Sequence, residues 1–157
     1  MRPRTKWLLL ILVALAAGIQ FVRPARTNPP EEFSRTIFAD QAVWAGAPKS
    51  IERACIDCHS SRTRWPWYSN VAPSSWLVAD DVAEGREHFD MSNWGTYTVS
   101  RKSALLEDIS KLVKAHSMPL PIYIPLHPEA KLTDQEREEI AAWADGARAR
   151  LESQSRK

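Results

Sequence analysis

Cysteine and glycine are scarce in this sequence: its 157 residues include two cysteines and five glycines. Two cysteines are too few for a disulfide-stapled fold or for a metal site with four cysteine ligands. The sequence also has no internal repeat and no low-complexity tract, which excludes repeat architectures. No segment alternates apolar and polar residues as a half-buried strand does. These absences predict an all-α fold, and eleven prolines indicate stiff, extended connections between its helices.

Acidic residues are absent from the first 26 positions, whereas five of the 21 basic residues lie there. The run Trp7–Val22 is almost entirely apolar and is flanked by Lys6 and Arg23, the pattern of a secretory signal or a membrane anchor. We expect residues 1–26 to form an uncleaved transmembrane helix in the bacterial inner membrane, with the rest of the chain in the periplasm. The alternative is cleavage at the small-residue site Ala14–Ala16, which would leave a soluble periplasmic protein.

The rest of the chain carries 16 basic and 19 acidic residues, a formal net charge of −3. The basic excess of the whole chain therefore belongs to the flanks of the anchor, which argues against a nucleic-acid partner. Three prolines between residues 23 and 30 predict an extended segment leaving the membrane. We expect a proline-rich tether at residues 27–34 and a folded domain at residues 35–150.

Both cysteines lie in the segment Cys55-Ile56-Asp57-Cys58-His59. Two cysteines separated by two residues and followed directly by histidine is the attachment pattern of a c-type haem. Each thiol can add across a haem vinyl group to form a thioether, and the adjacent imidazole can then reach the iron. The sequence therefore predicts one covalent haem c, with Cys55 and Cys58 as tethers and His59 as the proximal ligand. The export signal supports this prediction, because covalent haem attachment in bacteria takes place outside the cytoplasmic membrane.

Met118 is the leading candidate for the distal iron ligand. It precedes Pro119 in a proline-rich segment, and a stiff loop would help a weakly binding thioether to hold its place. His127 is the alternative distal ligand. The remaining possibilities are His88, Met91, His116 or an open coordination site. The identity of this ligand decides the function, because methionine raises the reduction potential and an open site would bind small gaseous ligands or peroxide.

Helical periodicity is clearest in the second half of the chain. A serine N-cap at residue 74 or 75 predicts a helix that runs to about His88. Leu105, Ile109, Leu112 and Val113 form one apolar stripe of a predicted helix at residues 100–115. A shorter helix is expected from Ser50 into the haem motif. The sequence from Thr133 to Glu136 has the pattern of a capping box and predicts the start of a last helix.

Aromatic residues are concentrated just after the haem motif. Trp65, Trp67 and Tyr68 form one block, and Trp76 follows within the next helix. We expect these rings to pack against the haem and exclude water. Arg86 is a candidate partner for the haem propionates, as are the polar atoms of the aromatic rings.

The sequence resembles the small bacterial haem-binding domain family of cytochrome c type. The resemblance rests on the following elements: Cys55 to Ser60, Trp65 to Ser69, Pro73 to Trp76, Asp81-Val82, Gly85-Arg86, Trp94, Met118-Pro119, Tyr123, His127-Pro128 and Trp143. It covers roughly residues 35–146. It implies a haem-binding domain behind a membrane anchor and brings no established reaction with it.

The expected function is that of a monohaem c-type cytochrome, a small helical domain that carries single electrons between unidentified redox proteins in the periplasm or at the membrane surface. An electron carrier of this kind needs no catalytic residue. The alternative is a haem-based sensor or a peroxidase-like protein with a labile or open sixth site. A haem-free zinc site would need two distant histidines beside the cysteines, and thioredoxin-like exchange would need a βαβ unit that this sequence lacks.

Overall fold

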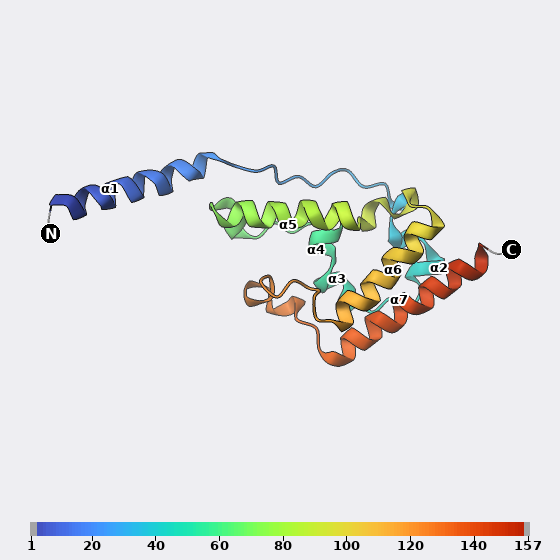
Figure 1. Ribbon diagram of the computed structural model, residues 1–157. Helices are drawn as coiled ribbons and strands as arrows, with labels where there is room; N and C mark the ends of the chain where they lie inside the picture. The colour runs from blue at the N-terminus through green and yellow to red at the C-terminus, as the bar shows by residue number, and fades with distance from the viewer. Residues whose placement is uncertain (1–2, 156–157) are drawn as a thin grey trace.

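The structure, a computed structural model, describes residues 3–155, which contain no β-strand. The prediction of an all-α fold is therefore confirmed. The α-helices are α1 (Pro3–Gly18), α2 (Gln41–Trp44), α3 (Ser50–Ala54), α4 (Ile56–His59), α5 (Ser74–His88), α6 (Val99–Lys114) and α7 (Asp134–Gln154) (Figure 1). The 3-10 helices are η1 (Ile19–Phe21), η2 (Phe33–Arg35), η3 (Ile37–Ala39), η4 (Trp67–Asn70), η5 (Met91–Thr96), η6 (Ile124–Leu126) and η7 (Pro128–Ala130).

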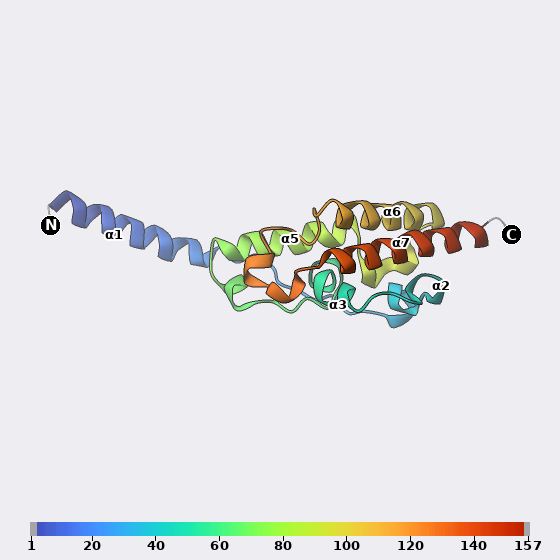
Figure 2. The same cartoon turned by 90° about the horizontal axis from the view of Figure 1, so that it is seen from below.

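Helices α6 and α7 pack side by side along their length and form the largest part of the domain (Figures 1 and 2). Both begin at a threonine cap: Thr98 accepts a hydrogen bond from the third residue of α6, and Thr133 forms the predicted capping box with Glu136. The capping box starts α7 because its two side chains satisfy backbone N–H groups that have no partner within the helix. The fully buried Leu106 and Ile140 lie in the core that the two helices share with α2, α3 and η5.

Helix α5 lies beside α4, which together with the preceding residue Cys55 forms the haem motif. Gly85 permits this close approach: a Cβ atom at this position would lie 2.8 Å from the carbonyl oxygen of Cys58. After α5 the chain turns through η5, where Trp94 is fully buried and donates a hydrogen bond from Nε1 to Asp40 Oδ2. The haem motif is therefore held between α5 on one side and the core on the other.

Helix α1 projects away from the rest of the protein (Figures 1 and 2). The window Arg4–Phe21 is long and apolar enough to cross a membrane, and none of it is buried. Length and composition of this kind are shared by membrane spans and by signal sequences near an N-terminus.

The segment that follows α1 is extended, as its prolines predicted, but it is bound to the domain rather than free. Arg86 donates hydrogen bonds to the carbonyl oxygen of Thr27 at 2.9 Å and to Asn28 Oδ1 at 3.1 Å. Asn28 in turn donates to the carbonyl oxygen of Thr63 at 2.8 Å. Farther along, Glu31 pairs with Arg62. These contacts connect the segment to α5 and to the loop after the haem motif.

Candidate haem site

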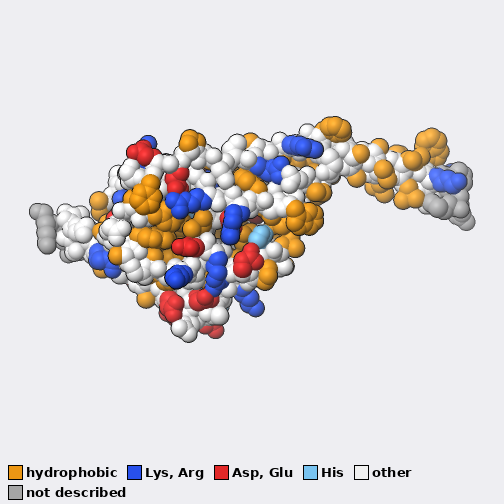
Figure 3. All heavy atoms as spheres, turned by 180° about the vertical axis from the view of Figure 1, so that it is seen from behind, with side chains coloured by type: hydrophobic (Ala, Val, Ile, Leu, Met, Phe, Trp, Pro, Cys, Tyr) orange, Lys and Arg blue, Asp and Glu red, His pale blue; other side chains and the backbone are white. Residues whose placement is uncertain are grey.

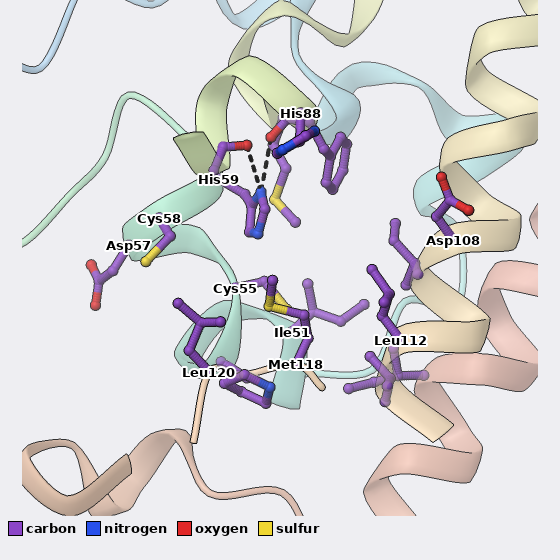
Figure 4. Close-up of a pocket in the computed structure, with 18 of the residues that line it drawn as sticks. Ile51, Cys55, Asp57, Cys58, His59, His88, Asp108, Leu112, Met118 and Leu120 are labelled. Carbon is purple, nitrogen blue, oxygen red and sulfur yellow. Dashed lines mark hydrogen bonds between the residues drawn. The ribbon is translucent and has the colours of Figure 1, made fainter. Parts of the chain in front are cut away.

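A cavity of about 400 Å³ opens between the haem motif, the C-terminal half of α5, one face of α6 and the loop that follows α6. Its size falls within the roughly 300–1,000 Å³ of small-molecule and cofactor sites. Its wall is mainly apolar, with Leu105, Leu112 and Leu120 among its residues. Figure 4 shows His59 on one side of this space, Met118 and Leu120 on the other, and Cys55 between them.

His59 is the last residue of α4, and α5 fixes the orientation of its ring. Its Nδ1 atom lies 2.9 Å from the carbonyl oxygen of Gly85 and 3.0 Å from that of Phe89 (Figure 4). Because carbonyl oxygens only accept, Nδ1 must carry the proton, which leaves the lone pair on Nε2. Burial lowers the pKa of His59 below its ordinary value, which favours the neutral ring. A neutral imidazole with a fixed tautomer is what iron ligation requires.

The two thiols of the haem motif both line the cavity. Burial raises the pKa of Cys55 to about 12, with the negative charge of a Cys58 thiolate acting in the same direction. Burial also raises the pKa of Cys58 to about 11, with Asp81 and Asp57 acting in the same direction. Both groups are therefore protonated at neutral pH. Thiol–disulfide exchange proceeds through a thiolate, so this environment disfavours a thioredoxin-like role.

Met118 lines the same cavity from the loop after α6. A buried arginine holds this loop in place: Arg137 donates hydrogen bonds from one guanidinium nitrogen to the carbonyl oxygens of Met118 at 2.8 Å and Val113 at 2.9 Å. The N–H of Met118 also donates to the carbonyl oxygen of Leu112 at 3.2 Å. The prolines of this segment predict that it is stiff. The sequence does not reveal that Arg137 on α7 anchors it, because Arg137 is distant from Met118 in the chain.

The other candidate ligands lie in different surroundings. His127 is buried outside the cavity, where its ring stacks on Tyr123 at 3.7 Å between centroids and lies 3.3 Å from the hydroxyl of Tyr68. His116 follows α6 with a φ of 57° and a largely exposed side chain. His88 and Met91 do line the cavity, and both come from the segment at the end of α5 that also carries the carbonyl groups bound to His59.

The aromatic block and Arg86 lie outside the wall of the cavity. None of Trp65, Trp67, Tyr68, Trp76 and Arg86 is among the residues that line the cavity. Three of them instead hold the segment after α1: Trp76 Nε1 donates to the carbonyl oxygen of Val22 at 2.8 Å, Trp65 Nε1 donates to Asn28 at 3.2 Å, and Arg86 also binds Asn28. Trp67 is 77% exposed. The hydrogen-bond partners of Trp65, Trp76 and Arg86 thus include groups of an extended segment with no sequence pattern of its own, and packing of the block against a haem stays a prediction.

Two arginines that the sequence analysis did not single out line the cavity. Arg53 on α3 is bound to Glu136 and to backbone carbonyl groups near the start of α7. Arg101 on α6 donates a hydrogen bond to the carbonyl oxygen of His88 at 2.8 Å and is otherwise exposed to solvent. The spacing of Arg101, Leu105, Asp108 and Leu112 places them on one helical face. This spacing could have identified Arg101 as a cavity residue, because the same face of α6 supplies apolar residues to the cavity wall.

The donor atoms of the cavity fit a haem better than a metal ion bound by protein ligands alone. Within residues 3–155, no group of three or more His, Cys, Asp or Glu side chains is arranged to hold a metal ion. A haem supplies four nitrogen ligands itself and needs at most one side chain on each face. The cavity offers an oriented histidine, a methionine and two thiols within an apolar wall.

The fold and this cavity define a haem-binding helical protein. The sequence model of the haem-binding domain family matches residues 14–146, and the chain belongs to that family. The resemblance inferred from the motifs is thereby confirmed. Over 101 residues, the chain is 28% identical to the cytochrome c peroxidase Ccp of Escherichia coli strain K12. This similarity covers 62% of the chain and 22% of the relative, so the chain spans about a fifth of the length of that curated protein. No solved structure matches the chain significantly.

Proposed function

We propose that the protein is a monohaem c-type cytochrome that transfers single electrons at the outer surface of the bacterial inner membrane. The observation that carries this proposal is the geometry of His59, whose Nδ1 is bound to two carbonyl oxygens so that Nε2 is free for iron. Cys55 and Cys58 border the same cavity and would hold one haem by thioether bonds. Met118 would be the distal ligand, because it lines the cavity whereas His127 does not.

A bound haem supplies one-electron chemistry, and the protein's residues set its conditions. The apolar wall around Leu105 and Leu112 excludes water, which favours the reduced state by lowering the local dielectric. Thioether ligation by Met118 acts in the same direction. Arg101 is the cavity arginine whose exposed guanidinium is suited to pair with a propionate. Together these residues describe an electron carrier of raised potential.

The N-terminal helix supports a proposal for the location of the domain. We propose that α1 is an uncleaved anchor with its basic end in the cytoplasm, so that the domain faces the periplasm. The relative's name assigns peroxidase activity to a protein of which this chain spans about a fifth. The relative's peroxidase activity is therefore not carried over to this chain, and the proposal of electron delivery to a redox protein rests on the haem site.

The covalent haem can be tested with protein produced alongside the cytochrome c maturation machinery. A pyridine haemochrome spectrum of the c type is expected for the wild type, and the same treatment of the double variant Cys55→Ser/Cys58→Ser is expected to release extractable haem. A wild-type spectrum without the c-type signature would contradict the attachment. The oxidised protein should also show the weak far-red sulfur-to-iron band, which Met118→Ala should abolish while His127→Ala retains it.

The name of the curated relative favours one further candidate, a peroxidase-like or sensor protein with a labile or open sixth site. Carbon monoxide separates the two candidates. Firm ligation by His59 and Met118 predicts that the reduced wild type does not bind carbon monoxide at neutral pH, whereas Met118→Ala does. Binding by the wild type would favour the sensor or peroxidase.

A further inference from the structure

Exposed apolar side chains are concentrated at the end of the domain from which α1 leaves. They come from η4, from the start of α5 and from the loop around η6: Trp67 is 77% exposed, Val71 46%, Leu77 58%, Ile122 73% and Leu126 63%. In both ribbon views, these three segments lie at the end of the domain next to α1 (Figures 1 and 2). Figure 3 shows hydrophobic side chains along the projecting helix and on the part of the domain next to it.

The chain is hydrogen-bonded to this end of the domain directly after α1. Gln20, in the last turn of the apolar window, forms two reciprocal hydrogen bonds with Ala72: its Nε2 donates to the carbonyl oxygen at 3.1 Å, and its Oε1 accepts from the N–H at 2.9 Å. Two residues farther on, the carbonyl oxygen of Val22 accepts from Trp76 Nε1 at 2.8 Å. The short helix η1, which continues α1, and the residue after it are therefore bound directly to the junction between η4 and α5.

These hydrogen bonds indicate which surface contacts the apolar end of the domain. If α1 crosses the bilayer, Gln20 lies at the membrane surface, and its partner Ala72 must lie at the same depth. Val71 directly precedes Ala72 and is the C-cap of η4, the 3-10 helix that begins at Trp67. Tryptophan is enriched at membrane–water interfaces, where the amphipathic indole sits among the headgroups. Arg23 and Arg26 follow the span and suit anionic headgroups.

We infer that this end of the domain is a membrane-contacting face, formed by Trp67, Val71, Leu77, Ile122 and Leu126, that rests in the interfacial region of the bilayer. The inference deepens the proposed function and rests on its membrane anchor. It has a consequence for the haem. The loop that carries Ile122 and Leu126 also supplies Met118, Leu120 and Tyr123 to the cavity wall, so the distal wall of the haem site lies on the membrane side.

The test uses the full-length haem protein in liposomes of phosphatidylcholine and phosphatidylglycerol, with a nitroxide attached to one introduced cysteine at a time. Cys55 and Cys58 are consumed by the thioethers and do not react. Asn70→Cys places the label on η4 and leaves Trp67 in place. Val99→Cys places a matched label at the opposite end of the domain, where α6 begins. Power saturation then compares collisions with oxygen, which concentrates in lipid, and with a water-soluble nickel chelate.

The oxygen-to-nickel ratio is expected to be clearly higher at position 70 than at position 99, and replacing Trp67 by serine is expected to lower it. Equal ratios at the two positions would overturn the membrane-contacting face. Equal ratios are also expected if this end of the domain binds a soluble protein instead of the bilayer. A third label at Val13→Cys tests the anchor. A lipid-exposed position 13 with a water-exposed position 70 refutes only the face, whereas a water-exposed position 13 refutes the anchor itself.

Discussion

Replacing Gly85 by alanine tests whether close packing between α5 and the haem motif determines stability. A Cβ atom at this position would lie 2.8 Å from the carbonyl oxygen of Cys58 and 3.3 Å from its carbonyl carbon and its Cβ. An ordinary contact begins near 3.4 Å, so α5 must move away from α4 by about 0.6 Å. The carbonyl group of Cys58 belongs to the backbone and cannot rotate aside as a side chain can. The loss in the free energy of unfolding is therefore expected in the upper part of the roughly 1–3 kcal/mol range for overpacking.

Alanine is also the better helix former, by about 1 kcal/mol. The net expectation for Gly85→Ala is a loss of about 1–2 kcal/mol in the free energy of unfolding. The haem spectrum should shift as well, because the displaced residue supplies a carbonyl oxygen to His59 Nδ1. Urea unfolding of the full-length haem protein in detergent, followed by circular dichroism and by absorbance, measures both effects.

Gly146→Ala is the matched control, since it makes the same substitution within α7. There the nearest atom would be the flexible end of the Arg150 side chain at 3.4 Å, so nothing obstructs the new methyl group. This variant should gain up to about 1 kcal/mol and leave the haem spectrum unchanged. The reasoning is refuted if Gly85→Ala is as stable as the wild type or changes in the same direction as Gly146→Ala.

Two further predictions concern charged groups. Hydrogen bonding to Arg53 lowers the pKa of Glu136 from 4.5 to about 2. Because the pKa of Glu136 is lower in the folded state, the pair contributes stability above about pH 4.5 and loses it as the pH falls towards 2. Urea titrations should therefore show the wild type losing stability relative to Glu136→Gln in that range. A constant difference in stability between the two proteins would contradict this. Arg101→Gln should lower the reduction potential in a spectroelectrochemical titration, because a cation near the haem disfavours the oxidised state, whereas Arg150→Gln, outside the cavity, should leave it unchanged.

Local patterns in the sequence were sufficient to place the helices. The predicted helix ending at about His88 corresponds to α5, although the predicted serine N-cap is wrong: the N-cap is Pro73, and no side chain caps the helix. The predicted helix at residues 100–115 corresponds to α6 within one residue at each end. The capping box at Thr133 starts α7 as expected. These features depend on residues within one or two helical turns of each other, so the sequence alone contains the information.

Interactions between distant segments were not visible in the same way. The whole apolar stripe of α6 lines the cavity, but its members differ in exposure: Leu105 and Val113 are buried, whereas Leu112 is 42% exposed. Trp76 looked like a haem-packing residue, yet its partner is the carbonyl oxygen of Val22, 54 positions away in the chain. Periodicity identifies which residues are apolar, but the partner of each face depends on how the elements pack.

Helix α5 connects the segment that follows α1 to the histidine of the haem motif. Near its start, Trp76 binds the segment that leaves the proposed anchor, and near its end Gly85 and Phe89 supply the carbonyl oxygens that orient His59. Gly85 lies nine positions after Trp76, which corresponds to about 14 Å along a helix axis. A regular helix does not stretch, so His59 is held at a set distance from the segment that follows α1. If α1 spans the membrane and His59 binds a haem, as proposed, α5 would keep that haem at a set distance from the bilayer.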